Sequence, residues 1–161
     1  MKATWLVWAS LDTVTLAGMY AEGTVNGQIM SAAFGAWIVF FISLKHGVPG
    51  WTRLDVFCLC SCVLGISFWK IFDNPLAGII ISSVANSIGC IPTCVSVWED
   101  SRRENKAGWV IGTMSSFFAM ASIQEWTPAY YVQPISFLMM QIVVLYLLFL
   151  RAAVPLPITL E

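Results

Sequence analysis

Residues 131–150, YVQPISFLMMQIVVLYLLFL, contain no charged side chain over a run long enough to cross a lipid bilayer. A spanning helix needs about 20 mostly apolar residues, because the hydrocarbon layer is about 30 Å thick and each residue rises about 1.5 Å. Working outward along the chain, similar runs alternate with short polar or Gly/Pro-containing turns. The expected spans are residues 3–21, 25–44, 55–72, 75–97, 107–125 and 131–150. The sequence therefore predicts an all-α, polytopic transmembrane bundle of six spans, with residues 1–161 forming a single domain.

Composition points to the same class. Hydrophobic residues make up 58% of the chain and charged residues 11%, against about 25% charged in a typical soluble domain. This excludes a water-soluble fold and makes the lipid bilayer the expected surroundings. The eight Lys and Arg residues and nine Asp and Glu residues leave a formal charge of -1. Without a basic excess to neutralise phosphates, nucleic acid is excluded as a partner.

The positions of the basic residues predict how the bundle is oriented in the membrane, and they do so independently of the apolar runs. Lys and Arg near span ends collect on the cytoplasmic side of a membrane. Only Lys70 falls on one side of the predicted bundle. The other side carries Lys2, Lys45, Arg53, Arg102, Arg103, Lys106 and Arg151. We expect a multi-pass protein of the plasma (inner) membrane with both termini in the cytoplasm.

Four of the six expected spans carry a polar side chain near the bilayer centre. Asp12 lies at the midpoint of the first span, where a carboxylate costs about 2.5–3.5 kcal/mol on insertion scales. With no basic residue at its depth, we expect Asp12 to be protonated or to face a hydrated cavity. Asn86, Ser116 and Gln141 lie at a similar depth in later spans. Either these groups form interhelical hydrogen bonds, each worth about 0.6 kcal/mol, or they bind a solute.

The fourth span is rich in small residues, which permit close helix packing and predict a central position. Pro92 lies within it and removes one backbone hydrogen bond, so a kink is expected there. The kink is interpreted either as a hinge or as a static bend.

The chain shows no pattern typical of a catalytic centre, and we predict no catalytic residues, no cofactor and no enzymatic activity. Two cysteine pairs, Cys58 with Cys62 and Cys90 with Cys94, fall at similar depth on the third and fourth spans. Four thiolates could hold a soft metal, but buried cysteines more often pack as small hydrophobes. We therefore predict no metal site. The charged run 99–106 is typical of a solvated connector.

Several short stretches carry a resemblance to a known family. They are Trp5-Leu6-Val7-Trp8, Ser43-Leu44-Lys45-His46-Gly47, Trp51-Thr52-Arg53-Leu54-Asp55, Asn74-Pro75-Leu76, Ile91-Pro92-Thr93, Trp98-Glu99-Asp100 and Arg103-Glu104-Asn105. The chain resembles an uncharacterised bacterial family of integral membrane proteins, which is in turn similar to the PQ-loop and SWEET/SemiSWEET transporter group. At the position of the Pro-Gln motif this chain has Pro92-Thr93.

The resemblance implies two parallel three-helix bundles joined by a linker helix. Residues 1–44 would then form an incomplete first bundle that lacks its first helix, residues 55–72 the linker, and residues 75–150 the complete bundle. Two alternatives would account for the missing helix. Either the start of the chain is shortened, or a second copy completes the bundle in a homodimer.

The sequence thus predicts a membrane protein that transports or binds a small polar solute at the midplane. Asp12 would accept hydrogen bonds or couple a proton, and Trp8 would stack on an apolar face of the solute. Asn86, Ser116 and Gln141 would orient the solute, and Pro92 would act as the hinge. The alternative is a non-transporting scaffold or assembly subunit whose midplane polar groups only join the helices.

Overall fold

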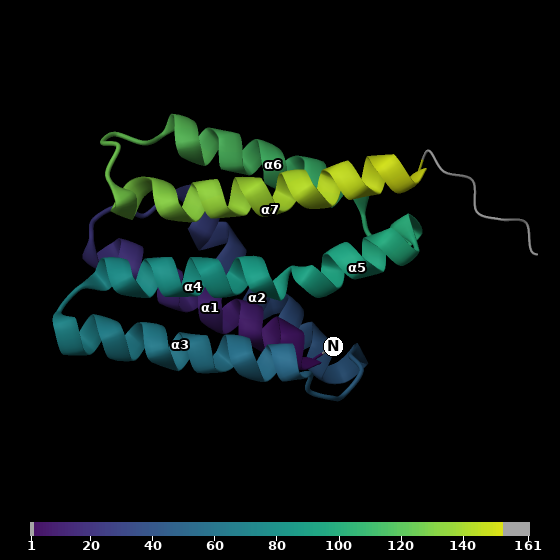
Figure 1. Cartoon of the computed structure of the whole chain (residues 1–161), viewed down its shortest axis with the longest axis horizontal. Coiled ribbons are helices and arrows are strands. Elements are labelled where there is room, and N and C mark those ends of the chain that lie inside the picture. The colour runs from purple at the N-terminus through teal and green to yellow at the C-terminus, as the bar shows by residue number, and fades with distance from the viewer. Residues whose placement is uncertain (1, 153–161) are drawn as a thin grey trace, which may run out of the picture.

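The computed structural model describes residues 2–152, apart from the side chains of Arg103, Arg151 and Ala152. Within this range the protein is helical and contains no strand, which confirms the predicted all-α class. The elements are α1 (Lys2–Ala21), α2 (Gly27–His46), α3 (Arg53–Phe72), α4 (Pro75–Gly89), α5 (Ile91–Glu99), the short 3₁₀ helix η1 (Ser101–Arg103), α6 (Lys106–Ala121) and α7 (Pro128–Ala152). The long helices run roughly along one axis, which is horizontal in Figure 1.

Local capping fixes where several helices begin. The side chain of Asn26 accepts a hydrogen bond from the backbone N–H of Ile29 and caps α2. At α3, Thr52 and Asp55 form a reciprocal capping box, with Asp55 N to Thr52 Oγ1 at 3.0 Å and Thr52 N to Asp55 Oδ2 at 2.9 Å. Such caps satisfy backbone donors that have no partner inside the helix. Asp55 therefore belongs to the first turn of α3 and stabilises its start.

Helices α1 and α4 form the centre of the bundle. Helix α1 packs against α2, α3 and α4, while α4 also packs against α3 and α7. The central position predicted for the fourth span is thus confirmed. Gly18 makes close approach possible, because a Cβ there would meet Ile79 Cγ1 at 2.8 Å and the Pro75 carbonyl oxygen at 3.1 Å. On the far side, α6 packs mainly against α7.

Four stretches of helix are long and apolar enough to cross a membrane: Gly27–His46, Arg53–Phe72, Pro75–Glu99 and Pro128–Leu150. Large apolar side chains are exposed on their outer faces, among them Phe34, Val63 and Met139. Extensive exposed apolar surface is unusual in a soluble monomer. These helices are compatible with an integral membrane protein.

Two of the expected spans fall outside this set. Helix α1 has 20 residues, but polar side chains including Asp12 lower its mean hydropathy. Helix α6 has 16 residues, which corresponds to a length of about 24 Å, less than the apolar layer. It ends at Ala121 and not at residue 125 as predicted. The backbone turns at Ser122, whose hydroxyl donates to the carbonyl of Ala119, and Ile123 N donates to the Met120 carbonyl.

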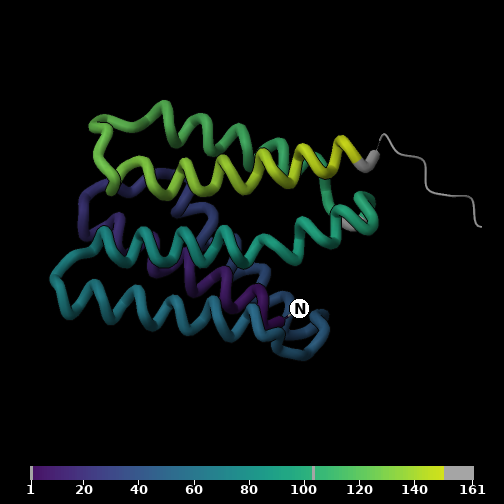
Figure 2. The backbone as a smooth tube through the Cα atoms, in the orientation of Figure 1, coloured from purple at the N-terminus to yellow at the C-terminus, as the bar shows by residue number. Residues whose placement is uncertain are grey.

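The fourth predicted span is interrupted as expected. Helix α4 ends at Gly89 and α5 begins at Ile91, with Cys90 between them and Pro92 in the first turn of α5. Proline has no N–H, so the first turn of a helix, where the N–H groups have no partner inside the helix, is the position at which it costs least. The tube in Figure 2 changes direction at this break. The predicted kink is therefore confirmed, and its use as a hinge stays a prediction.

Most of the basic residues whose side chains the structure describes lie at one end of the bundle. Lys2 lies beside the α2–α3 connection, where its backbone N donates to the Val48 carbonyl and its Nζ to the Leu44 carbonyl. The N-terminus, this connection and α5 share one end in Figure 1. Lys45 lies in the last turn of α2, whereas Lys70 lies in the last turn of α3. The division into residues 1–44, 55–72 and 75–150 stays a prediction.

Candidate functional site

The centre of the bundle holds a buried carboxyl–amide pair. Asn86 Nδ2 of α4 donates to Asp12 Oδ1 of α1 at 2.7 Å, and the two residues are only 2% and 4% exposed. One turn away, the hydroxyls of Thr15 and Ser82 share a hydrogen bond of 2.6 Å between the same two helices. These contacts, together with the close approach at Gly18, fix the position of Asp12 relative to Asn86.

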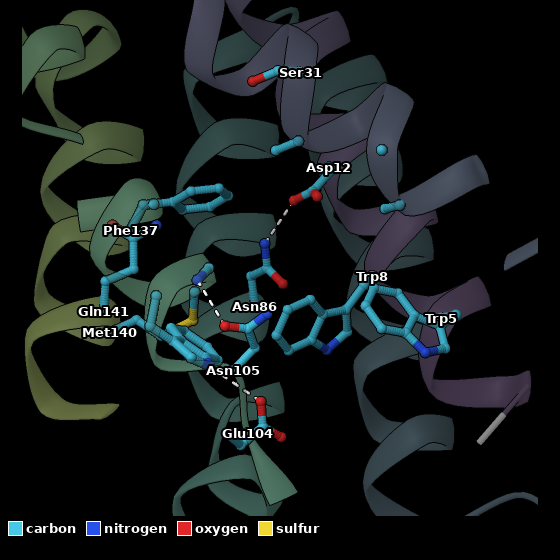
Figure 3. A pocket seen from close by; sticks show the side chains of 16 residues that line it. Trp5, Trp8, Asp12, Ser31, Asn86, Glu104, Asn105, Phe137, Met140 and Gln141 are labelled. Carbon is cyan, nitrogen blue, oxygen red and sulfur yellow. Dashed lines mark hydrogen bonds between the residues drawn. The ribbon is translucent and has the colours of Figure 1, made fainter. Parts of the chain in front are cut away.

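A cavity of about 400 Å³ opens beside this pair. Four of the predicted binding residues line it: Trp8, Asp12, Asn86 and Gln141. Figure 3 shows Asp12 and Asn86 bonded to each other, with Trp8 next to them and Gln141 across the cavity. Its other lining residues are mostly apolar, small or aromatic. A concave, mainly apolar site with a few convergent polar groups is typical of small-molecule binding.

The cavity reaches from the middle of the bundle to the start of α6. Glu104, Asn105 and Trp109 line it there. Trp109 Nε1 donates to Glu104 Oε2 at 3.1 Å, and the Asn105 side chain caps α6 by accepting from the N–H groups of Ala107 and Gly108. This is also the end of the bundle at which Lys106 begins α6. Sequence reasoning treated Glu104 as part of a solvated connector and missed its place at the cavity.

Ser116 does not line the cavity, although it was predicted to bind there. It belongs to a buried chain of hydrogen bonds that joins α2, α6 and α7, here called the amide ladder and consisting of Asn26, Gln133, Gln28, Ser116 and Gln141. Asn26 Nδ2 donates to Gln133 Oε1 at 2.9 Å, and Gln133 Nε2 donates to Gln28 Oε1 at 3.1 Å. Gln28 Nε2 donates to Ser116 Oγ, which donates to Gln141 Oε1 at 2.6 Å. Gln141 is the one member of the ladder that lines the cavity.

Sequence reasoning missed Asn26, Gln28 and Gln133 because they lie near span ends, where polar side chains ordinarily meet water. Gln28 follows the first residue of α2 by one position, and Gln133 lies in the second turn of α7. Both helices start at the same end of the bundle, so the two amides meet at one depth. The sequence signal that could have identified Gln28 and Gln133 is that each of two otherwise apolar helices carries a side-chain amide at the same depth.

Polar atoms without a partner distinguish the cavity from the ladder. Among the described residues, three buried side-chain atoms make no hydrogen bond: Trp8 Nε1, Asn86 Oδ1 and Ser83 Oγ. Two of them belong to residues that line the cavity. Buried polar groups in folded proteins are nearly always bonded, and an exception needs an explanation. A bound solute would supply one here.

The two cysteine pairs pack in different parts of the molecule. Cys58 and Cys62 belong to an apolar cluster with Val7, Leu11 and Ala85, and Cys58 Sγ donates to the Ala85 carbonyl at 3.5 Å. The second pair packs elsewhere, in a cluster that includes Val144 and Leu148 of α7. The Cys58–Cys62 pair and the Cys90–Cys94 pair therefore belong to two separate apolar clusters.

Comparison with models of known protein families, with curated proteins and with solved structures gave no match to this chain. The fold and the site define its class as a helical bundle, compatible with an integral membrane protein, that has a partly polar cavity between α1, α2, α4, α6 and α7.

Proposed function

We propose that this chain is a six-span membrane protein that binds a small polar solute in the cavity at Asp12 and moves it across the bilayer. One observation carries the proposal. The cavity is lined by a buried carboxyl–amide pair, and two of its lining residues have polar atoms that lack a partner among the described residues. Polar groups this deep in a membrane protein are costly and usually mark a solute or ion pathway.

The membrane placement in this proposal rests on the basic end of the bundle. By the rule that Lys and Arg collect on the cytoplasmic side, that end and both termini would face the cytoplasm of a plasma (inner) membrane. The cavity would then open toward the cytoplasm, since it reaches Glu104 and Asn105. A relationship to the PQ-loop and SWEET group and the formation of a homodimer are further parts of this proposal.

The roles of the lining residues follow from their chemistry. Asp12 and Asn86 would bind the polar part of the solute, while the ring of Trp8 would cover an apolar face. The amide ladder extends from Gln141 toward the start of α7. In this conformation the ladder would close the side of the bundle that faces away from the cytoplasm. For the solute to cross the membrane, hydrogen bonds of the ladder would have to break. The break at Cys90 beside Pro92 is the proposed hinge, and no catalytic step is assigned.

Uptake into proteoliposomes tests the proposal. Radiolabelled glucose, glycine, succinate and choline would be offered to vesicles that contain wild type, Asp12→Asn or Asp73→Asn. Asp73 is an exposed carboxylate at the end of α3, in the left-handed conformation that Asn tolerates. We expect one of the four solutes to accumulate with wild type and Asp73→Asn but not with Asp12→Asn. Uptake no greater than in protein-free vesicles would contradict transport.

A second candidate is the scaffold or assembly subunit, which the amide ladder favours. Its members bond to one another in an unbroken chain between three helices, as expected of groups that only join helices. If Asp12 served the same purpose, Asp12→Asn would leave all measured activities unchanged.

A further inference from the structure

The cavity has a marked charge character. Two carboxyl side chains line it, Asp12 and Glu104, and no Lys, Arg or His is among its described lining residues. Lys106, which directly follows the lining residue Asn105, has its Nζ 5.7 Å from the ring centroid of Phe149 on α7. We propose that the solute is a small organic cation of the alkylammonium class. This inference rests on the proposed solute site and names its ligand.

The carboxyl of Asp12 is incompletely paired. Its Oδ1 accepts from Asn86, and its Oδ2 has no hydrogen-bond partner among the described residues. Removing a carboxylate from water is costly unless a cation or donors compensate it. An ammonium group at Oδ2 would supply the opposite charge. A neutral solute would supply hydrogen bonds alone, and an anion would be repelled by both carboxylates.

Aromatic rings surround the same space. The cavity is lined by three indole side chains, Trp5, Trp8 and Trp109. The rings of Trp5 and Trp8 meet edge to face with centroids 6.0 Å apart. Tryptophan is the ring that best attracts an organic cation, and several aromatic rings together are the usual recognition site for ammonium groups. Carboxylates and indoles thus favour the same ligand.

The unpartnered atoms add hydrogen-bond positions. Asn86 Oδ1 is a buried acceptor, and Trp8 Nε1 is a buried donor. Both atoms are covered by neighbouring groups, with Trp8 Nε1 beside Gly89 of α4. A rotation of each side chain would let an N–H or hydroxyl of the ligand bond to Asn86 Oδ1 and a hydroxyl oxygen accept from Trp8 Nε1. A metal ion fits less well, since the described residues contain no group of three or more His, Cys, Asp or Glu side chains placed to hold one.

Choline and its neutral isostere, 3,3-dimethylbutan-1-ol, separate charge from shape. Calorimetric titration of the detergent-purified protein would measure the affinity of each. We expect choline to bind at least about tenfold more tightly than the isostere, because only choline carries the positive charge that the indole rings and Asp12 attract. Asp12→Asn should weaken choline binding about tenfold or more. Asp73→Asn should leave it unchanged.

Trp8→Phe provides a second variant if Asp12→Asn does not fold. It retains an aromatic ring but removes the indole N–H and weakens the attraction for a cation, so the affinity for choline should fall more than the affinity for the isostere. Equal binding of choline and the isostere would overturn the inference, as would choline binding unaffected by Asp12→Asn or by Trp8→Phe.

Glucose, glycine and succinate distinguish this failure from failure of the site itself. If one of them binds in an Asp12-dependent manner and choline does not, the solute site stands and its assignment to cations is wrong. If neither choline nor any of the three binds, both the cation assignment and the solute site are overturned.

Discussion

The amide ladder of α2, α6 and α7 and the Asp12–Asn86 pair of α1 and α4 are both polar clusters buried in an apolar bundle. The four links of the ladder join Asn26, Gln133, Gln28, Ser116 and Gln141 without interruption. The central pair has one link, and Asn86 Oδ1 and the neighbouring Trp8 Nε1 have no partner among the described residues. The ladder has the bonding expected of groups that hold helices together, and the pair has that expected of a binding site.

The largest expected effect comes from breaking the ladder. Gln133 is fully buried, and its side chain bonds to both Asn26 and Gln28. Gln133→Leu leaves the buried Gln28 Oε1 and the half-buried Asn26 Nδ2 without this partner, so the free energy of unfolding should fall by about 1–3 kcal/mol. Thermal unfolding in detergent would measure the loss. Gln124→Leu, at an exposed position after α6, is the control. Equal stability of Gln133→Leu and wild type would contradict the structural role of the ladder.

Asp12→Asn should separate binding from stability. The Asn side chain can still accept from Asn86 Nδ2, so the free energy of unfolding should change by less than about 1 kcal/mol. Solute affinity should fall about tenfold or more, equivalent to about 1.4 kcal/mol. Calorimetric titration and thermal unfolding of one preparation would measure both quantities. A loss of stability as large as that of Gln133→Leu would mean that Asp12 serves mainly to join helices.

Ser116→Ala tests the link between the two clusters. The change removes the acceptor for Gln28 Nε2 and the donor to Gln141 Oε1, and two such bonds in a membrane protein are worth about 1 kcal/mol together. Because Gln141 also lines the cavity, solute affinity should fall only slightly. Ser115→Ala on the same helix is the matched control for both measurements. A change at Ser116 no larger than at Ser115 would show that the two clusters are independent.

Pro92→Ala should have the smallest equilibrium effect. Pro92 lies in the first turn of α5 and does not line the cavity, so solute affinity and stability should change little. If the α4–α5 break is a hinge, the initial rate of uptake should change at least about twofold. Pro128→Ala, at the first residue of α7, is the control. An unchanged rate would assign the break to a static bend.

The helical fold and the polar residues Asp12 and Asn86 at the centre of the bundle could be predicted from the sequence. Asp12 was identified because a carboxyl group in the middle of an apolar run has few structural explanations. The pairing with Asn86 follows from equal depth once α1 and α4 are adjacent. Helix α6 ends at Ala121, four residues before the predicted end of the span. The polar residues Ser122, Gln124 and Glu125 directly after it are the sequence signal that could have placed this end.

The ladder was hidden for a different reason. The glutamines at 28 and 133 lie near span ends, where polarity is ordinary, and their burial depends on how α2 and α7 meet α6. Ser116 was predicted at the right depth but assigned to the wrong cluster, because sequence gives the depth of a residue more readily than the direction of its side chain around the helix. Glu104 was missed because its loop folds back to the cavity at Trp109.

The most direct test of a binding site at Asp12 measures how far a ligand stabilises wild type and one variant from each of the two polar clusters. The melting temperatures of wild type, Asp12→Asn and Gln133→Leu would be recorded with and without saturating choline, glucose, glycine or succinate. A solute at a hundred times its Kd should stabilise the folded state by about 2.7 kcal/mol. We predict that one solute stabilises wild type and Gln133→Leu, which melts lower, but not Asp12→Asn. Stabilisation that persists in Asp12→Asn, or no stabilisation of wild type by any of the four, would contradict a binding site at Asp12.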